Sequence, residues 1–363
     1  MPARRLPVDA HKPDPEAIRQ AAATLAAGGL VAFPTETVYG LGADALNAAA
    51  VSRIFDAKGR PADNPIIVHL ADPAALSDVV TAVPSAARAL IARCWPGPLT
   101  LVLPSVPDVP LVTRGGLPTV AVRIPSHPVA LALIRAAERP VAAPSANRSG
   151  RPSPTTAQHV LADLGDAVDV VLDAGPTPLG VESTVLDVTG PTPVLLRPGG
   201  VSLEALEAIV GRVIVPPTGA HPIPGAAALL LRSPGTRYRH YAPRARVILV
   251  EAPPEQVAAD LSAAVHRLWD EGLRVGAMVT AEAARDVPPD AVVRVMGSRS
   301  DPATVAAHLF AQLRELDDAG LDAIVVEGIA EGGVGRAVMD RLRRAAQHPR
   351  DEPDQGPPKD QPR

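Results

Sequence analysis

The stretch at residues 30–70 constrains the fold of this chain more than any other part of the sequence. An apolar run at 30–33 gives way at Pro34 to a polar turn, Thr35-Glu36-Thr37, and then to glycines at 40 and 42. A short helical stretch follows and ends in Lys58-Gly59-Arg60, before a second apolar run reaches residue 70. The order strand, polar loop, helix, cationic loop, strand is typical of an open α/β sheet, which binds its ligands at strand ends.

The cations of this stretch are of two different kinds. The chain holds 35 Lys+Arg, but only Lys12, Lys58 and Lys359 are lysines. A lysine is a compact point charge and an arginine is a planar fork, so they are not equivalent. Lys58 two residues before Arg60 therefore suggests two different contacts with one anion, such as a phosphate chain. An incidental charge at a solvated helix end is the alternative, and spacing alone does not decide between the two.

Length and composition limit the classes of protein. At 363 residues we expect two domains. One cysteine excludes a disulfide within the chain and a cysteine-rich zinc site, and it fits a reducing compartment. No run reaches the ~18 apolar residues of a membrane helix, and the first 15 residues lack the apolar core of a signal peptide. We therefore expect a cytoplasmic protein with no membrane partner.

The pattern of residues 14–210 predicts alternating helices and strands. Helices are expected at 14–28, 47–58, 85–93, 128–138 and 202–210, with further helices beginning at Asp72 and at Thr155 or Thr156. Strands are expected at 66–70, 99–103, 119–125, 168–172, 183–188 and 194–197, and from residue 141.

Two of these strands deliver polar groups to a possible functional face. The 119–125 strand alternates, so its Arg123 is expected to point outward from the apolar neighbours. After the strand at 141, Ser145 and Asn147 lie on one side if the loop stays extended. An ordinary turn is the alternative for this Ser-x-Asn motif, and for the motif alone it is the preferred one.

Residues 211–246 change character and then a second α/β pattern begins. The segment 232–246 holds five arginines, no acidic residue, and Tyr238 and Tyr241. A segment that closes over an anionic ligand and a solvated interdomain strap are both compatible with it. Strands expected at 247–250, 275–280, 292–295 and 323–327, with helices at 254–271, 302–319 and 334–346, predict a small parallel α/β domain. The tail after residue 347 is polar and proline-rich and is expected to be disordered.

Six motifs occur in order and carry a family resemblance. They are PTETVYGLG, Lys58-x-Arg60 with its NPIIVH continuation, AVRIPSH, PSAN, STV and LRPG. Together they closely resemble the YrdC-like family of threonylcarbamoyl-AMP synthases over residues 14–344. The SPGTRYRHYAP segment and the second α/β domain resemble the long two-domain form. Thr236 stands where methionine is expected, and residues 211–231 form a long, alanine-rich stretch.

The resemblance implies a fold and a domain arrangement. It implies a YrdC-like twisted open mixed sheet with helices, joined by a basic linker to a smaller Rossmann-like parallel α/β domain. The implied bounds are 14–200 for the catalytic domain and 201–246 for the linker, which would act as an active-site lid. The C-terminal domain would occupy 247–347, and the disordered tail 348–363.

The resemblance also implies a reaction. ATP, L-threonine and bicarbonate would give threonylcarbamoyl-AMP, pyrophosphate and water. The product would supply N6-threonylcarbamoyladenosine next to the anticodon of tRNA, through a separate transferase machinery. Binding of tRNA by this chain would be weak or indirect. Mg²⁺ would be held mainly by the ATP phosphates, with no metal site of the protein's own, and no zinc, flavin or NAD is expected.

The resemblance implies residues for each of the two ligands. Lys58 and Arg60 would be the catalytic pair on the triphosphate. The ATP site would hold Lys58, Arg60, Asn64, Thr119, Ser145, Asn147, Ser153, Arg197, Ser233, Tyr238 and His240. The L-threonine site would hold Thr35, Thr37, His69, Arg123, Ala143 and Ser183.

Two other functions are weighed against this one. An RNA-binding or ribosome-assembly module needs a basic face, yet residues 1–200 hold 16 Lys+Arg against 17 Asp+Glu. A carbamoyl-adenylating carbamoyltransferase of the hydrogenase-maturation type would resemble this chain over the first domain only. Such proteins add cysteine-rich zinc modules, which a chain with one cysteine cannot form.

Overall fold

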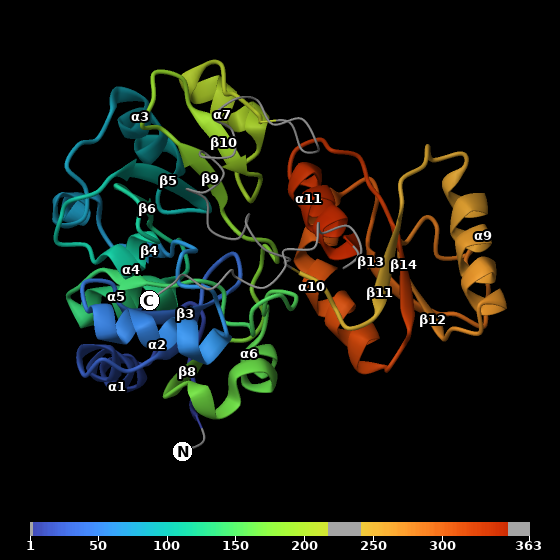
Figure 1. The fold of residues 1–363 in the computed structure, drawn as a ribbon, viewed down its shortest axis with the longest axis horizontal. Helices are drawn as coiled ribbons and strands as arrows, with labels where there is room; N and C mark the ends of the chain where they lie inside the picture. The colour runs from blue at the N-terminus through green and yellow to red at the C-terminus, as the bar shows by residue number, and fades with distance from the viewer. Residues whose placement is uncertain (1–2, 217–240, 348–363) are drawn as a thin grey trace, which may run out of the picture.

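The computed structural model describes residues 3–216 and 241–347, which form two α/β domains side by side (Figure 1). The first domain is built on a ten-stranded mixed sheet. In spatial order its strands are β1 (Arg4–Pro7), β8 (Val170–Asp173), β2 (Val31–Pro34), β3 (Tyr39–Asp44), β7 (Val141–Ala142), β4 (Ile67–His69), β6 (Thr119–Arg123), β5 (Leu99–Pro104), β9 (Thr184–Asp187) and β10 (Val194–Arg197). The α-helices are α1 (Pro15–Ala26), α2 (Ala48–Lys58), α3 (Ser85–Cys94), α4 (Leu111–Arg114), α5 (Pro128–Ala137), α6 (Ala157–Leu164) and α7 (Leu203–Val210), with 3₁₀ turns at Pro73–Asp78 and Gly165–Ala167.

Helices cover the two faces of the β1–β8–β2–β3 half of this sheet because successive strand residues point to opposite sides. On β2, Val31 and Phe33 pack in the cluster formed with α1 and α5, whereas Ala32 faces the cluster that includes α2, α3 and α6. The predicted helix starts are confirmed at α1 and α2. Asp14 accepts a hydrogen bond from the amide of Ala17, and Asn47 caps α2 in the same way.

The second domain is a four-stranded sheet in the order β11 (Arg246–Val250), β14 (Ala323–Glu327), β12 (Val275–Thr280), β13 (Val292–Gly297). All its strand pairs are parallel, as the sequence predicted. Helix α9 (Val257–Asp270) covers the face away from the first domain, and α10 (Pro302–Asp318) with α11 (Gly335–Ala346) lies between the two sheets (Figure 1). Within the described residues, none of the helices has the length and apolar character needed to cross a membrane.

The mixed sheet and the parallel sheet confirm the predicted fold class, with local differences. The glycine pair was expected in a loop, but Gly40 and Gly42 lie inside β3, antiparallel to β2. Glycine is required there by packing, because a Cβ on Gly42 would lie 2.8 Å from the ring of Phe33. The helix expected at Asp72 is a 3₁₀ turn, and β1 was not predicted because its residues are mostly exposed and do not alternate. Strand β1 also lies before the predicted domain start at residue 14.

The two domains meet through a loop of the first domain at residues 177–183. On one side, the amides of Leu179 and Gly180 donate to the carbonyls of Glu36 and Thr37. On the other side, Gly180 approaches α10 so closely that a Cβ would lie 2.2 Å from the carbonyl oxygen of Ala306. Val181 packs in the apolar cluster of α10 and α11. The loop is therefore held between the Thr35-Glu36-Thr37 turn and the second domain.

We predict that Gly180→Ala weakens the contact between the domains. Gly180 has φ +74°, and Gly175 has φ +81° with no atom within 4 Å of its Cβ position. Gly175→Ala therefore isolates the backbone cost, about 1–2 kcal/mol. Gly180→Ala should lose about 1–3 kcal/mol more, from overpacking against α10. Urea unfolding of the full chain measures both, and equal losses would refute the close contact.

Candidate active site

A cavity in the first domain, beside the second, collects most of the predicted site residues. It is formed by the turn after β2, the ends of β4 and β6, the loop after β7, the start of β9 and the end of β10. Its lining residues are Thr35, Thr37, Val38, Gly40, Arg60, Ile67, His69, Arg123, Ala143, Pro144, Ser145, Asn147, Ser153, Glu182, Ser183, Arg197 and Tyr241. All six residues predicted for threonine are among them, and so are five of those predicted for ATP.

Arg123 organises one half of the cavity. Its Nη1 donates to the Thr37 hydroxyl at 3.0 Å, and its Nη2 lies 2.8 Å from Oε1 of Glu36. The hydroxyls of Thr35 and Thr37 are 2.7 Å apart. The sequence predicted an outward-pointing Arg123, but this arginine is only 3% exposed. The reason is that the face to which it points is closed by the turn at 35–37, whose acid compensates the buried charge.

His69 enters the same half as a neutral group. Burial and the nearby charge of Arg123 lower the pKa of His69 to about 3. Its Nδ1 lies 3.2 Å from the carbonyl oxygen of Ile67. At neutral pH this imidazole therefore offers a hydrogen-bonding edge without adding a second positive charge beside Arg123.

Ser183 and Arg197 connect the two halves. The Ser183 hydroxyl lies 2.8 Å from that of Thr100. Arg197 donates from Nε and Nη2 to the Ser183 carbonyl, at 3.2 and 2.9 Å. These contacts come from the neighbouring strands β5, β9 and β10, so the positions of both side chains are set by the sheet.

The loop after β7 forms the other half. The Ser145 hydroxyl donates to Oδ1 of Asn147 at 2.6 Å, which confirms that the two side chains lie together. The amide nitrogen of Asn147 donates to the carbonyls of Arg148 and Arg151 at 2.8 and 2.9 Å. The Asn147 side chain therefore stabilises a compact loop by bonding to residues on both sides of it, and the Ser145 hydroxyl is held at the cavity wall.

Lys58 lies beneath this loop and does not line the cavity. Its Nζ donates to the carbonyls of Ser145 and Asn147, at 2.6 and 2.5 Å. Burial, and then the charge of Arg60, holds the pKa of Lys58 well below its usual range. Here Lys58 fixes the shape of the loop, and its contact with a triphosphate stays a prediction.

The other predicted residues divide into two groups. Asn64 and Thr119 are buried but do not line the cavity. Thr119 lies at the start of β6, whereas the cavity is at the end of this strand, where Arg123 lies. Ser233, Tyr238 and His240 lie outside the described residues, as do the tail at 348–363 and most of the predicted lid.

Sequence reasoning missed three side chains with polar groups at or beside the cavity. Glu36 pairs with Arg123, Glu182 lines the wall, and Tyr241 closes one side. The signal for the acids was their position, because Glu36 lies inside PTETVYGLG and Glu182 directly precedes STV, and a carboxylate that is buried there needs a cation. Tyr241 was assigned to the linker as a whole, and nothing local distinguished it from Tyr238.

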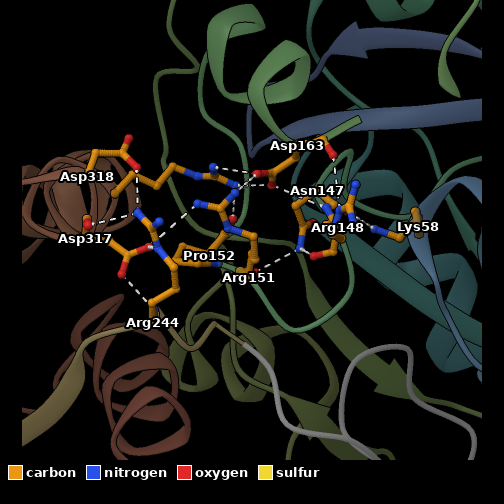
Figure 2. Close-up of polar contacts among 10 residues, drawn as sticks. Lys58, Asn147, Arg148, Arg151, Pro152, Asp163, Arg244, Asp317 and Asp318 are labelled. Carbon is orange, nitrogen blue, oxygen red and sulfur yellow. Dashed lines mark hydrogen bonds and ion pairs between the residues drawn. The ribbon is translucent and has the colours of Figure 1, made fainter. Parts of the chain in front are cut away.

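An ion-pair network links the loop after β7 to the second domain (Figure 2). Asp163 of α6 accepts from the backbone amide of Arg148 and from Nη1 of Arg151, at 3.3 and 2.6 Å. Arg314 of α10 reaches the same carboxylate, with Nη2 at 2.6 Å, and also donates to the carbonyl of Pro152. Figure 2 shows this network running from Lys58 to Asp317 on the second domain. Among the described residues, no group of three or more His, Cys, Asp and Glu is placed to hold a metal ion.

The fold and this cavity define a class of protein: an α/β protein whose buried arginines and hydroxyls at strand ends suit an anionic ligand. Residues 23–199 match the family Sua5_yciO_yrdC, described as "Telomere recombination". Residues 201–347 match Sua5_C, described as "Threonylcarbamoyl-AMP synthase, C-terminal domain".

Similar proteins extend over almost the whole chain. A Pyrococcus abyssi protein named threonylcarbamoyl-AMP synthase is 48% identical over 329 residues, covering 91% of this chain and 94% of its own. A Bacillus subtilis protein of the same name is 47% identical, covering 92% and 93%. A crystal structure of P. abyssi Sua5 complexed with L-threonine has a TM-score of 0.87 and 46% identity, covering 94% of this chain and 97% of that one. The chain therefore belongs to the threonylcarbamoyl-AMP synthase family, in its two-domain Sua5 form.

We predict that Arg314→Met destabilises the protein by about 3–5 kcal/mol, because it removes a partner from a buried ion pair. Arg314 is 4% exposed and Asp163 is fully buried in this pair. Arg294→Met is the matched control. Arg294 of β13 forms an ion pair with Glu315, which lies on α10 beside Arg314, but the two side chains of this pair are 39% and 51% exposed. The control should lose about 1 kcal/mol or less. Denaturant unfolding compares the two, and a small loss at Arg314 would refute the importance of this contact.

Proposed function

We propose that this chain is a threonylcarbamoyl-AMP synthase, which makes threonylcarbamoyl-AMP from ATP, L-threonine and bicarbonate. The observation that carries the proposal is the single cavity in which Arg123 and the threonine hydroxyls face the Ser145–Asn147 loop. Such a cavity suits an amino acid on one side and a nucleotide on the other. The names of the two-domain relatives support the same activity.

The Arg123 half is the L-threonine site. The planar guanidinium suits a threonine carboxylate, which it grips with two parallel hydrogen bonds. The hydroxyls of Thr35, Thr37 and Ser183 and the neutral His69 provide donors and acceptors for the side chain and the amine. Because Glu36 already contacts Arg123, the local charge is compensated before substrate arrives.

The loop after β7, with Arg60 and Arg197, is the ATP site. Cations and hydroxyls neutralise the charge that moves onto the leaving pyrophosphate, so positioning and electrostatics supply most of the catalysis. Lys58 contributes by holding the carbonyls of the loop, and it is available to the triphosphate if the loop opens. Magnesium belongs to the substrate MgATP, bound by phosphate oxygens and water.

The reaction requires no covalent enzyme intermediate. The threonine amine and bicarbonate form a carbamate and release water. A carbamate oxygen then attacks the α-phosphorus of ATP, and the bond to the β-phosphate oxygen breaks to release pyrophosphate. Burial of the cavity keeps water from the mixed anhydride. The adenylate passes to a transferase that modifies tRNA next to the anticodon, and the predicted lid at 201–246 would retain it until then.

We predict that the purified full chain releases pyrophosphate from ATP only when L-threonine and bicarbonate are both present. The expected product is threonylcarbamoyl-AMP, identified by its mass. The control replaces threonine and bicarbonate with carbamoyl phosphate, on which a carbamoyltransferase of the hydrogenase-maturation type would act. Pyrophosphate release that is independent of threonine, or that requires carbamoyl phosphate, would contradict the proposal.

We further predict that Arg123→Lys raises the KM for L-threonine by about tenfold or more, because the lysine ammonium cannot form the bidentate hydrogen bonds of a guanidinium with the threonine carboxylate. The KM for ATP should change little, since Arg123 lies in the other half of the cavity. Arg139→Lys serves as the control, because Arg139 pairs with Asp44 through a side chain that is 39% exposed. An unchanged KM for threonine in Arg123→Lys would argue against this assignment.

A further inference from the structure

One side chain of the second domain reaches the wall of the cavity. Arg341 of α11 is fully buried, although it is an arginine on the last helix within the described residues. Its Nε donates to Oε2 of Glu182 at 2.8 Å, and its Nη2 donates to the carbonyl of Pro198 at 3.0 Å. Glu182 lines the cavity and is only 6% exposed. The second domain therefore supplies the cation for an acid of the first.

The other oxygen of the same carboxylate holds a predicted ATP-site residue. The Ser153 hydroxyl donates to Oε1 of Glu182 at 2.5 Å. A continuous path thus runs from Arg341 through Glu182 to the hydroxyl of Ser153, which lines the cavity. Tyr241, also at the wall, lies beneath the guanidinium of Arg341, with 5.2 Å from the carbon Cζ to the ring centroid.

The charge of Glu182 depends on this contact. Burial alone would raise the pKa of Glu182, but the charges of Arg341 and Arg197 outweigh it and bring the pKa to about 2. The charged and titratable groups that face the pair are Arg197 at the end of β10, Tyr241 before β11 and Asp340 beside Arg341 on α11. An ionised carboxylate without its cation would repel the phosphates of ATP.

We propose that Arg341 is a positioning residue for the reaction: it orients Glu182, so that Ser153 is fixed toward the nucleotide, and it compensates the carboxylate's charge. This inference rests on the proposed synthase function. It assigns the second domain a direct part in the ATP site, through a contact 159 residues apart in the sequence. Since Arg341 acts through Glu182, its effect should appear in ATP binding more than in threonine binding.

The test uses full-length variants in the threonine-dependent pyrophosphate assay. Arg341→Gln should lower kcat/KM for ATP about 10- to 100-fold at about pH 8.5, because the buried carboxylate loses its partner. The loss relative to wild type should shrink as the pH is lowered to about 6, because removing the charge of Arg341 raises the pKa of Glu182 and a lower pH favours its neutral form. The double variant Glu182→Gln with Arg341→Gln should recover most of the activity at both pH values, because it removes the unpaired charge.

Arg343→Gln is the matched control on the same helix. Arg343 pairs with Glu251 and Glu331 of the second domain, away from the cavity, and its variant should behave like wild type. Equal kcat/KM for wild type and Arg341→Gln would overturn the inference, as would a loss that is independent of pH and persists in the double variant.

If Arg341→Gln does not fold, Arg341→Lys carries the test. It keeps the charge but loses the contact with Pro198, so a raised KM for ATP without a new pH dependence is expected. A KM equal to that of wild type would overturn the inference. Failure of the wild-type chain to show threonine-dependent release refutes the proposed function instead, so the two failures are distinguishable.

Discussion

The structure depends on buried ion pairs, in which an arginine and a carboxylate that are both nearly inaccessible to solvent compensate each other's charge. An isolated ion in a protein interior is far less stable than one in solvent, so each needs a partner with suitable geometry. At the cavity, Arg123 forms an ion pair with Glu36, and Glu182 forms one with Arg341. Below the loop after β7, Asp163 forms ion pairs with both Arg151 and Arg314. Two of these three acids draw their cation from the second domain, so the site and the domain contact are one electrostatic system.

This system also explains the place of Lys58. The ammonium is buried under the Ser145–Asn147 loop and donates to two of its carbonyls. Because burial lowers the pKa of Lys58 well below its usual range, removal of its proton is easier than in solvent. These two contacts hold the Ser145–Asn147 loop at the cavity wall.

Much of the fold was predictable because its signals are local. Asp14 and Asn47 mark the starts of their helices within three residues, and apolar runs mark β2, β4 and β5. All six residues predicted for threonine line the cavity, because five of them fall inside short motifs and Ala143 directly precedes PSAN. Of the residues predicted for ATP, the cavity lining includes Arg60, Ser145, Asn147, Ser153 and Arg197, but not Lys58, Asn64 or Thr119. A motif gives the position of a residue in the chain but not the direction of its side chain.

What the sequence did not reveal comes from contacts between distant segments. The pairs Arg341–Glu182 and Arg314–Asp163 join residues 159 and 151 positions apart, and no periodicity marks either arginine. The glycines of β3 were assigned to a loop, because their function is to admit the ring of Phe33 from a neighbouring strand. The edge strand β1 is too exposed to show alternation.

The cluster that α10 and α11 form with Val38 and Val181 has a consequence for how this chain unfolds. Separating the two sheets would take Val38 and Val181 out of this cluster, and it would leave Glu182 without Arg341 and Arg314 without Asp163. Such a state combines the loss of apolar burial with the exposure or stranding of charge. The two domains are therefore coupled in stability, and on heating they should unfold together in one cooperative transition.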